Sequence, residues 1–467
     1  SCSKEDNSSQ SSSSDPQFYT LTININPSEG GSVNVISGRF SPGQSVEITA
    51  SPNQYFNFKE WTGDLSQSSE NATIIMDSNK SITANFNKFF WVDNNGVTLK
   101  VSPETPFGTE IEYNGQTYKV VDHEEIISGC INGIDISKTI TSNIESEQFI
   151  GLLWNCDTNF NADISHWDIS NATNLRRFFY YSHNFNQDIS NWDVSNVTDM
   201  HLMFANNFKF NQPIGSWDVS NVTDMYGMFS QTIFNQPIGD WDVSNVLSME
   251  GMFHNSSFNQ PIGDWDVSKV TIMRAMFSQK NCGGSGDGIQ DGCYLTNRQG
   301  WPDGDEYCTG CTAEGTFNQD ISNWDVSNVT NMEKMFQGQN VFNQPLNSWD
   351  VSNVSSMKLM FRENWRFNQP LNDWNVSNVT NMMGMFQGTI DFNQPLNDWD
   401  VSNVTNMQRM FYRSYFYNQD LSNWVVSQIG CFREFHCYND SLCDNYHGYE
   451  ACESSWTLSK PLFTFGG

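Results

Sequence analysis

The sequence predicts a mainly β, α/β solenoid, a right-handed array of about 25-residue coils, preceded by a small all-β domain. One observation is the alternation of apolar and polar residues in short runs over residues 17–88. The other is a sequence repeat of nearly constant length, which indicates a fold built by stacking one unit on the next. Ten tryptophans recur 24 or 25 residues apart, with one gap of 59 residues, at Trp167, Trp192, Trp217, Trp241, Trp265, Trp324, Trp349, Trp374, Trp399 and Trp424.

The first half of each repeat is predicted to be a strand, as residues 185–204 illustrate. Ile189, Trp192 and Val194 match the L-x-x-L-x-L spacing of leucine-rich repeats. Side chains alternate across a strand, so Trp192 and Val194 are expected to point inward. The tryptophans are therefore predicted to be core residues and not platforms for sugars.

The second half of each repeat is predicted to be helical. The segment Val197–Phe204 places apolar residues three and four positions apart, which is the spacing of one helix face. Thr198 is suited to cap such a helix, and Asp199 is suited to its positive end. One strand and one or two helical turns would close each coil around an apolar core.

Aspartates directly follow most of the tryptophans and are predicted to face solvent. Asn375 and Val425 interrupt the row. Carboxylates at the strand spacing of about 4.8 Å repel each other unless donors or cations compensate. Two interpretations follow: an internal hydrogen-bond ladder with the serines two positions on, or a strip that binds cations or a glycan. The row consists of Asp168, Asp193, Asp218, Asp242, Asp266, Asp325, Asp350 and Asp400.

The repeat resembles a known family. The string F-N-Q-D-I-S-N-W-D-V-S-N-V-T-x-M at 185–200 recurs with small changes to about residue 427. It is similar to the DUF285 repeats of the BspA-like group of bacterial surface proteins, which are relatives of leucine-rich repeats. The similarity implies a leucine-rich-repeat-like array at residues 161–430 in a surface protein of the adhesin or recognition type. It supplies no catalytic residues.

Residues 1–16 resemble the tether of a bacterial lipoprotein. Cys2 would carry the lipid, and the Ser- and Gln-rich run after it would be flexible. Lys4, Glu5 and Asp6 resemble the export signal that sends lipoproteins of Bacteroidetes to the outer face of the outer membrane. These resemblances imply a protein that faces the cell exterior and meets the membrane only through its lipid anchor. The alternative is an ordinary flexible terminus with a chance cysteine.

Residues 17–88 resemble a stalk module. The strings G-G-S-V at 30–33, F-x-x-W-x-G-D at 58–64 and S-I-T-A-N-F at 81–86 are similar to the divergent internalin-type B-repeat. This resemblance implies a spacer on a cell-surface protein, and a ligand-binding domain is the alternative. The expected strands are 19–24, 45–50, 72–76 and 81–86.

Caps are expected at both ends of the array. Residues 89–160 resemble the N-terminal cap that precedes DUF285 arrays, and they contain the hairpin signal Asn114-Gly115. Residues 431–467 are rich in cysteine and are predicted to cap the other end. A cap is needed because an open end would expose core residues and unpaired backbone groups.

Ten of the 11 cysteines remain once Cys2 is assigned to lipid, and an even number suits disulfides in an oxidising compartment. Cys308-x-x-Cys311 is alternatively half of a zinc site, but no second C-x-x-C accompanies it. The disulfide candidates are Cys130, Cys156, Cys282, Cys293, Cys308, Cys311, Cys431, Cys437, Cys443 and Cys452.

The long gap between Trp265 and Trp324 is one 25-residue coil with 34 inserted residues, 282–315. Long insertions from a repeat array often carry the specific contact. Oxygen-rich turns of this kind suit Ca²⁺, although the spacing matches no EF-hand loop. A solvated excursion held by disulfides is therefore the favoured interpretation. The Ca²⁺ candidates are Asp287, Asp291, Asp303 and Asp305.

The composition excludes several classes of function. The formal net charge is -30, from 53 acidic and 23 basic residues, which argues against nucleic acid and anionic membrane surfaces as partners. No apolar stretch approaches the roughly 20 residues that span a bilayer. The sequence has no motif for a nucleophile, a catalytic metal or a phosphate site, so it predicts no enzyme and, apart from Ca²⁺, no cofactor. A carboxylate pair acting on glycans is the remaining enzymatic alternative.

The predicted function is a binding or adhesion scaffold for a protein or a glycan at the cell surface. Tryptophan, tyrosine and arginine dominate binding hot spots, and five of them lie in loops otherwise filled with small or polar residues. The alternative for this cluster is that the rings cover the edge of the coil. The alternative function is a structural accessory subunit of an outer-membrane complex for transport, secretion or assembly. The predicted contact residues are Trp365, Arg366, Tyr412, Arg413 and Tyr415.

Overall fold

The protein is described by a computed structural model that divides into two compact units, Ser1–Pro106 and Phe107–Gly467. The described part is mostly β, with the single α-helix α1 (His123–Asn132) and no closed barrel. None of its helices has the length and apolar character to cross a membrane. The described residues are 17–154, 156, 159–279 and 315–426.

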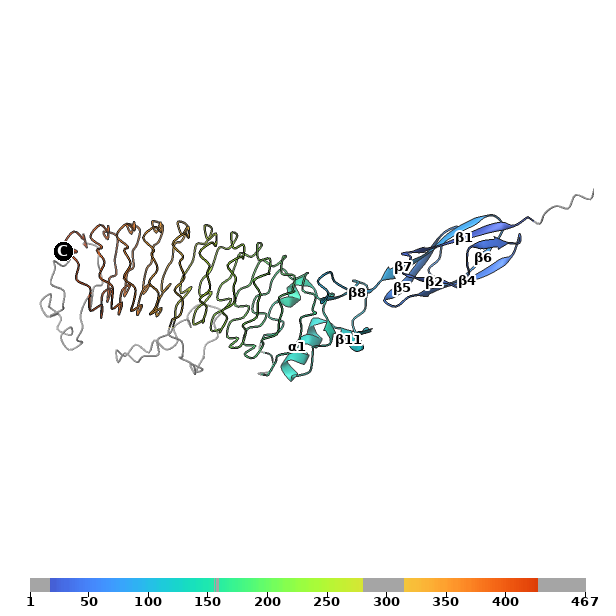
Figure 1. Ribbon diagram of the computed structural model, residues 1–467, viewed down its shortest axis with the longest axis horizontal. Helices are drawn as coiled ribbons and strands as arrows, with labels where there is room; N and C mark the ends of the chain where they lie inside the picture. The colour runs from blue at the N-terminus through green and yellow to red at the C-terminus, as the bar shows by residue number, and fades with distance from the viewer. Residues whose placement is uncertain (1–16, 155, 157–158, 280–314, 427–467) are drawn as a thin grey trace, which may run out of the picture. The chain divides into compact units, whose positions relative to one another are not determined.

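The strands of the first unit form three sheets (Figure 1). They are β1 Tyr19–Asn26, β2 Gly31–Val33, β3 Gly38–Phe40, β4 Ser45–Pro52, β5 Phe56–Gly63, β6 Asn71–Ile75, β7 Lys80–Lys88, β8 Phe90–Val92 and β9 Leu99–Val101. One sheet has the order β3-β1-β7-β5, in which β1 and β7 run parallel. A second has the order β2-β4-β6, and β8 pairs with β9. The four strands expected from the sequence overlap β1, β4, β6 and β7, so the all-β prediction is confirmed.

The first unit has a core of its own. Leu21, Trp61 and Ile82 are fully buried within it. The Trp61 Nε1–H donates to the Ser69 carbonyl at 3.1 Å, so the one polar group of the buried ring is satisfied. The alternation of apolar residues thus places one side of each long strand in the core.

The second unit begins with the predicted hairpin. Strands β10 (Glu110–Tyr113) and β11 (Gln116–Val120) are antiparallel, and Asn114 and Gly115 between them have φ of 50° and 73°. A two-residue turn of this kind needs both residues in the left-handed region, which explains the Asn-Gly pair. Strand β12 (Thr139–Ile140) pairs in parallel with β11.

Helix α1 begins and ends at residues suited to these positions. The Asp122 side chain accepts a hydrogen bond from the Glu125 N–H at 2.9 Å, and Gly133 ends the helix with φ of 67°. The short 3-10 helix η1 (Ser146–Phe149) follows before the first repeat.

This N-terminal segment covers the start of the repeats. Ile126, Cys130 and Phe149 belong to the same continuous core as the repeats, and α1 lies beside the first of them in Figure 1. Cys130, a disulfide candidate, is bonded to Cys156, with the two Cα atoms 4.9 Å apart. The core is therefore closed at its N-terminal end.

The repeats lie side by side and are joined by parallel bridges (Figure 1). Ile272 pairs directly with Asn331 on the other side of residues 280–314, so the long gap in the tryptophan spacing does not interrupt the pairing. One residue of each repeat makes the bridge, in the order Asn174, Asp199, Asp224, Ser248, Ile272, Asn331, Ser356, Asn381 and Asn406.

The segment Val197–Phe204 is not helical, so this prediction is wrong. The N–H groups of Met200 and Leu202 donate to carbonyls of the next repeat at 3.0 and 2.8 Å, whereas a helix would bond them to carbonyls within the segment. Leu202 has φ of 56°, which a right-handed helix does not allow. The Thr198 hydroxyl donates to the Thr173 carbonyl of the preceding repeat at 3.1 Å instead of capping a helix.

The segment Ile189–Val194 contains one turn and no strand, so the predicted strand is also wrong. The Trp192 N–H donates to the Ile189 carbonyl at 3.1 Å and closes this turn. The predicted burial is nevertheless confirmed, because Trp192 and Val194 are buried while Asp193 between them is exposed. The Trp192 Nε1–H donates to the Ile164 carbonyl of the preceding repeat at 3.2 Å.

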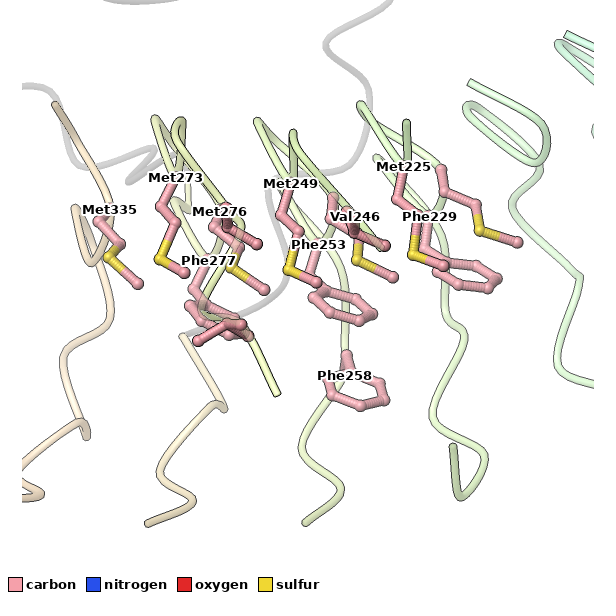
Figure 2. Packing of buried hydrophobic residues seen from close by; sticks show 14 of the residues in the cluster. Met225, Phe229, Val246, Met249, Phe253, Phe258, Met273, Met276, Phe277 and Met335 are labelled. Atoms are coloured by element: carbon pink, nitrogen blue, oxygen red, sulfur yellow. The ribbon is translucent and has the colours of Figure 1, made fainter. Parts of the chain in front are cut away.

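Rows of methionine and phenylalanine run through the core of the repeats, as Figure 2 shows. Met225, Met249 and Met273 occupy equivalent positions and are fully buried. Phe253 stacks on Phe258 of its own repeat, with ring centroids 4.0 Å apart, and on the phenylalanine of the next repeat at 5.7 Å. Thioethers beside rings fill irregular space well, so the core is continuous from repeat to repeat.

An amide ladder explains the recurring F-N-Q string. The Asn211 N–H donates to Asn186 Oδ1 at 2.9 Å, and Gln212 Nε2 donates to the Asn186 carbonyl at 2.9 Å. The same two bonds recur in later repeats as far as Asn418 and Gln419. Each repeat thus satisfies polar groups of its neighbour in a partly buried layer.

We expect Trp349→Ala to lower the free energy of unfolding of the second unit by about 3–5 kcal/mol, because the change opens a cavity around a buried ring. Trp349→Phe is the matched variant: it keeps a ring and loses only the hydrogen bond from Nε1 to the Ile321 carbonyl, so its loss should be smaller. Urea unfolding followed by circular dichroism measures both. An alanine variant as stable as the unaltered protein would contradict the buried position.

Candidate functional site

Hydrogen bonds within each repeat hold the aspartate row. Asp193 Oδ1 accepts from the Ser195 N–H at 3.1 Å and from the Ser195 hydroxyl at 2.6 Å. The Asn221 side-chain amide of the next repeat donates to the Ser195 carbonyl at 2.8 Å. The row is therefore an internal hydrogen-bond ladder, which is the first of the two interpretations that the sequence left open.

These hydrogen bonds lower the pKa of several aspartates below the ordinary value of 3.8, and the serine side chain contributes most in each case. The bond favours the charged form because the carboxylate is the better acceptor. Asn375 fills the same position, and its Oδ1 also accepts from the Ser377 N–H, at 3.2 Å. The ladder thus needs an acceptor but not a charge. The affected aspartates are Asp242, Asp266, Asp350 and Asp400.

Charged side chains beside the parallel bridges pair between neighbouring repeats. Arg274 lies 2.7 Å from Glu250, and Lys358 lies 3.4 Å from Glu333. The first pair is largely buried, with Glu250 4% exposed, so each partner offsets the desolvation of the other; the second is half-buried and stabilises only weakly. They do neutralise each other, so this face offers a partner no strip of one charge.

Three of the five predicted contact residues are exposed. Trp365 is 44% exposed and Tyr415 is 40% exposed, and both occupy the fourth position after a core phenylalanine. Arg366 is largely exposed and pairs with Asp391 of the intervening repeat at 3.3 Å. The Asp391 N–H also donates to the Trp365 carbonyl at 3.0 Å, so the intervening loop lies against the loop of Trp365. We call Trp365, Arg366 and Tyr415 the C-terminal cluster.

Tyr412 and Arg413 have a different arrangement from the prediction. Tyr412 is 1% exposed, and Arg409 and Arg413 lie over its ring at 5.5 and 5.1 Å from the centroid. A ring between two guanidinium groups is stabilised by cation–π attraction. Tyr412 is therefore a buried support for this end of the repeats and not a contact residue.

Sequence reasoning missed other exposed apolar residues in the same loops. Phe416 is exposed beside Tyr415. Aligning the loops by their position between the two phenylalanines of each repeat would have found them, because the period fixes that register. The further residues are Phe208, Ile233 and Val341. We call Phe208, Ile233, Val341 and Phe416 the loop edge.

Several predicted residues lie outside the described residues. They include the anchor residues Cys2, Lys4, Glu5 and Asp6, and the Ca²⁺ candidates Asp287, Asp291, Asp303 and Asp305. Across the described ranges, no three His, Cys, Asp or Glu side chains gather in a way that would hold a metal ion. The remaining disulfide candidates, also outside, are Cys282, Cys293, Cys308, Cys311, Cys431, Cys437, Cys443 and Cys452.

Comparison with known families gives two matches. A family model described as "Mycoplasma protein of unknown function, DUF285" matches residues 146–256, 216–282, 310–378 and 348–447, which together make up more than half of the chain. A second, described as "Divergent InlB B-repeat domain", matches residues 21–89. The resemblances to the DUF285 repeats and to the divergent internalin-type B-repeat are therefore confirmed. No curated protein and no solved structure matches the chain.

We expect the aspartate row to make the second unit less stable in acid. Its folded pKa values lie below the unfolded value of 3.8, so the ladder's contribution is present above pH 3.8 and is lost as the pH falls through the folded values. Thermal unfolding between pH 7 and pH 2.5 measures this loss of stability when the unaltered protein is compared with a combined variant. It carries Asp242→Asn, Asp266→Asn, Asp350→Asn and Asp400→Asn.

The combined variant keeps every acceptor but cannot titrate at these positions, as Asn375 illustrates. Its stability should fall less with acid than that of the unaltered protein, by about 1 kcal/mol in total for four solvent-screened groups. An identical pH dependence in the two proteins would contradict the role of the carboxylates.

Proposed function

This chain belongs to the family described as Mycoplasma protein of unknown function, DUF285, and we propose that it is a non-enzymatic adhesion scaffold that binds a partner protein at the cell surface. The observation that carries the proposal is the exposure of Trp365 and Tyr415 at equivalent loop positions, with Arg366 beside them. Large rings cost stability when they stay in water, so their exposure favours a binding role. Tryptophan, tyrosine and arginine are the residue types that contribute most to protein interfaces.

The scaffold in this proposal is a right-handed, leucine-rich-repeat-like solenoid. Parallel bridges from Asn174 to Asn406 support it, because each repeat pairs only with its two neighbours. The amide ladder and the stacked phenylalanines support it as well, since both continue from one repeat to the next. In such an array the buried residues and the residues of the amide ladder are required for packing one repeat on the next. The loop edge is therefore the part of each repeat that is available for recognition.

Surface attachment in this proposal depends on a lipid at Cys2. The polar, Ser-rich run that follows supports a flexible tether, and Lys4, Glu5 and Asp6 direct the protein to the outer face of the outer membrane. The module that matches the Divergent InlB B-repeat domain then spaces the repeats from the membrane. The partner is a protein exposed at, or presented to, the cell surface.

We expect the double variant Trp365→Ala, Tyr415→Ala to lose the partner while keeping its fold. Co-purification with the full-length protein after cross-linking on intact cells, followed by mass spectrometry, identifies the retained protein. Loss of two exposed hot-spot rings should weaken binding at least 100-fold and change thermal unfolding little, because neither ring is buried.

The matched control is Ile75→Ala, Leu247→Ala, which removes two exposed apolar side chains that lie outside both the loop edge and the C-terminal cluster. This control should retain the partner fully. Retention by the test variant, or loss in test and control alike, would reject the C-terminal cluster as the contact.

We expect Cys2→Ser to release the protein from the membrane, because no described helix is able to replace the lipid. Replacing Lys4, Glu5 and Asp6 by alanine should leave the protein anchored but facing the periplasm. Fractionation tests the first variant, and protease treatment of intact cells tests the second. Unchanged protease sensitivity of the second variant would remove the export signal from the proposal.

A further inference from the structure

A second group of rings lies at the other end of the repeats, between the cap and the second repeat. The rings of Trp154, Tyr180, Tyr181, His183 and Phe208 follow one another, with successive centroids 6.0, 4.5, 5.5 and 4.8 Å apart. We call these five residues the aromatic run. Phe208 also belongs to the loop edge, and the other four residues have no part in the proposed function.

The aromatic run lies outside the main core. Tyr180 is buried in a small separate cluster with Leu202 and Ala205, against which Tyr181 and Tyr226 pack. This cluster forms on the outward side of the bridge segments, whose inward side chains belong to the continuous core. The run therefore covers the outer surface of the repeats and does not fill their interior.

The two ends of the run are open to solvent. Trp154 is 46% exposed and Phe208 is 45% exposed. His183 and Phe208 are parallel to within 1°, so they present their rings as one stack. Arg177 lies 5.6 Å from the centroids of both Trp154 and Tyr180, which fixes the orientation of the tryptophan by cation–π attraction. The exposed rings are thus held in place before any ligand arrives.

Polar groups without protein partners lie next to the run. His183 Nδ1–H donates to the Asn206 carbonyl at 2.8 Å, and the Asn206 N–H donates to the Ser230 carbonyl at 2.9 Å. Within the described part of the chain, Asn206 Nδ2 and Ser230 Oγ are buried and make no hydrogen bond. Buried polar atoms are nearly always satisfied, so these two atoms point to a polar partner such as a hydroxyl group.

We propose that the aromatic run binds a neutral carbohydrate chain. A pyranose has an apolar face that packs on an aromatic ring and a rim of hydroxyl groups, so it matches exposed rings beside unsatisfied donors and acceptors. Arg177 keeps its charge but lies over the Trp154 and Tyr180 rings, His201 pairs with Asp224 at 3.5 Å, and the chain as a whole carries a formal net charge of -30. An anionic ligand therefore gains little at this surface.

The same surface is poorly suited to a protein partner. The aliphatic residues of the cluster, Leu202 and Ala205, and the ring of Tyr180 are buried, so the exposed apolar area lies mainly on the rings at the two ends of the run and is not a broad contiguous patch. Protein interfaces bury such a patch at their centre. The carbohydrate site is therefore distinct from the C-terminal cluster, and it does not depend on the function proposed for that cluster.

Native gel electrophoresis of the full chain through soluble polysaccharides tests the site. The gels contain β-glucan, mannan, xylan or galactan, and polygalacturonate serves as the anionic comparison. We expect at least one neutral polysaccharide to slow the protein. Trp154→Ala and Phe208→Ala should each weaken this binding roughly tenfold, as loss of one stacked ring does. Trp365→Ala, in the C-terminal cluster, should leave it unchanged.

Trp154→Phe keeps an aromatic ring at this position. It therefore serves as a control in case the alanine variant fails to fold. In the unaltered protein the bound polysaccharide should change the tryptophan fluorescence, and this change should shrink in Trp154→Phe while thermal unfolding stays the same. Migration unaffected by all four neutral polysaccharides, retardation equal in the alanine variants, or retardation by polygalacturonate alone would each overturn the proposal.

Discussion

Hydrogen bonds that cross from each repeat to the next are the constraint on which the rest of the array depends. The Asn186 side chain accepts from the backbone of the following repeat, and the tryptophan indole donates back to the preceding one. These bonds satisfy groups that would otherwise be buried without partners, at a cost of about 1–3 kcal/mol each. Every repeat needs the same hydrogen-bond partners at the same position, so asparagine, glutamine and tryptophan recur once in each repeat at these positions.

Because of this constraint, some positions of each repeat are fixed by the contacts between repeats and others can vary. Inward residues such as Met225 and Phe253 stack in rows, and a change of size in one would disturb its neighbours on both sides. The aspartates and serines complete turns within their own repeat. Only the loops between the two phenylalanines, and the outward residues beside the bridges, carry side chains that stacking does not specify. The proposed recognition therefore falls at the margins of each repeat, outside its uniform interior.

The sequence predicted which residues face inward better than it predicted the path of the backbone. Inward positions at Met200, Met203 and Phe204 fit a helix, yet they also fit a turn closed by the Met203 N–H and the Met200 carbonyl with Leu202 in the left-handed region. The two arrangements differ in which carbonyls the N–H groups reach, and the spacing of apolar residues does not record that. The Asn114-Gly115 hairpin was predictable because its turn requires those two residues.

The candidate site was predictable only in part. Trp365 and Tyr415 stood out as unusual loop residues, and both are exposed. Tyr412 looked equivalent to them in sequence, but Arg409 and Arg413 of the same segment lie over its ring. Both arginines have a positive φ, 58° and 61°, and the residue types do not reveal that local path of the backbone. The aromatic run was not predicted at all. Its five rings come from the cap and two repeats, so only the stacking of those segments brings them together.

The direct pairing of Ile272 with Asn331 has a consequence for how such a protein acquires new specificity. Phe277 and Phe317 lie on the two sides of residues 280–314, and their ring centroids are 3.8 Å apart, as close as the corresponding pairs in uninterrupted repeats. The repeats on the two sides of the 34 inserted residues therefore pair as neighbours do elsewhere. The loop between the two phenylalanines is thus a position at which evolution or design can add sequence while the pairing of the repeats is kept.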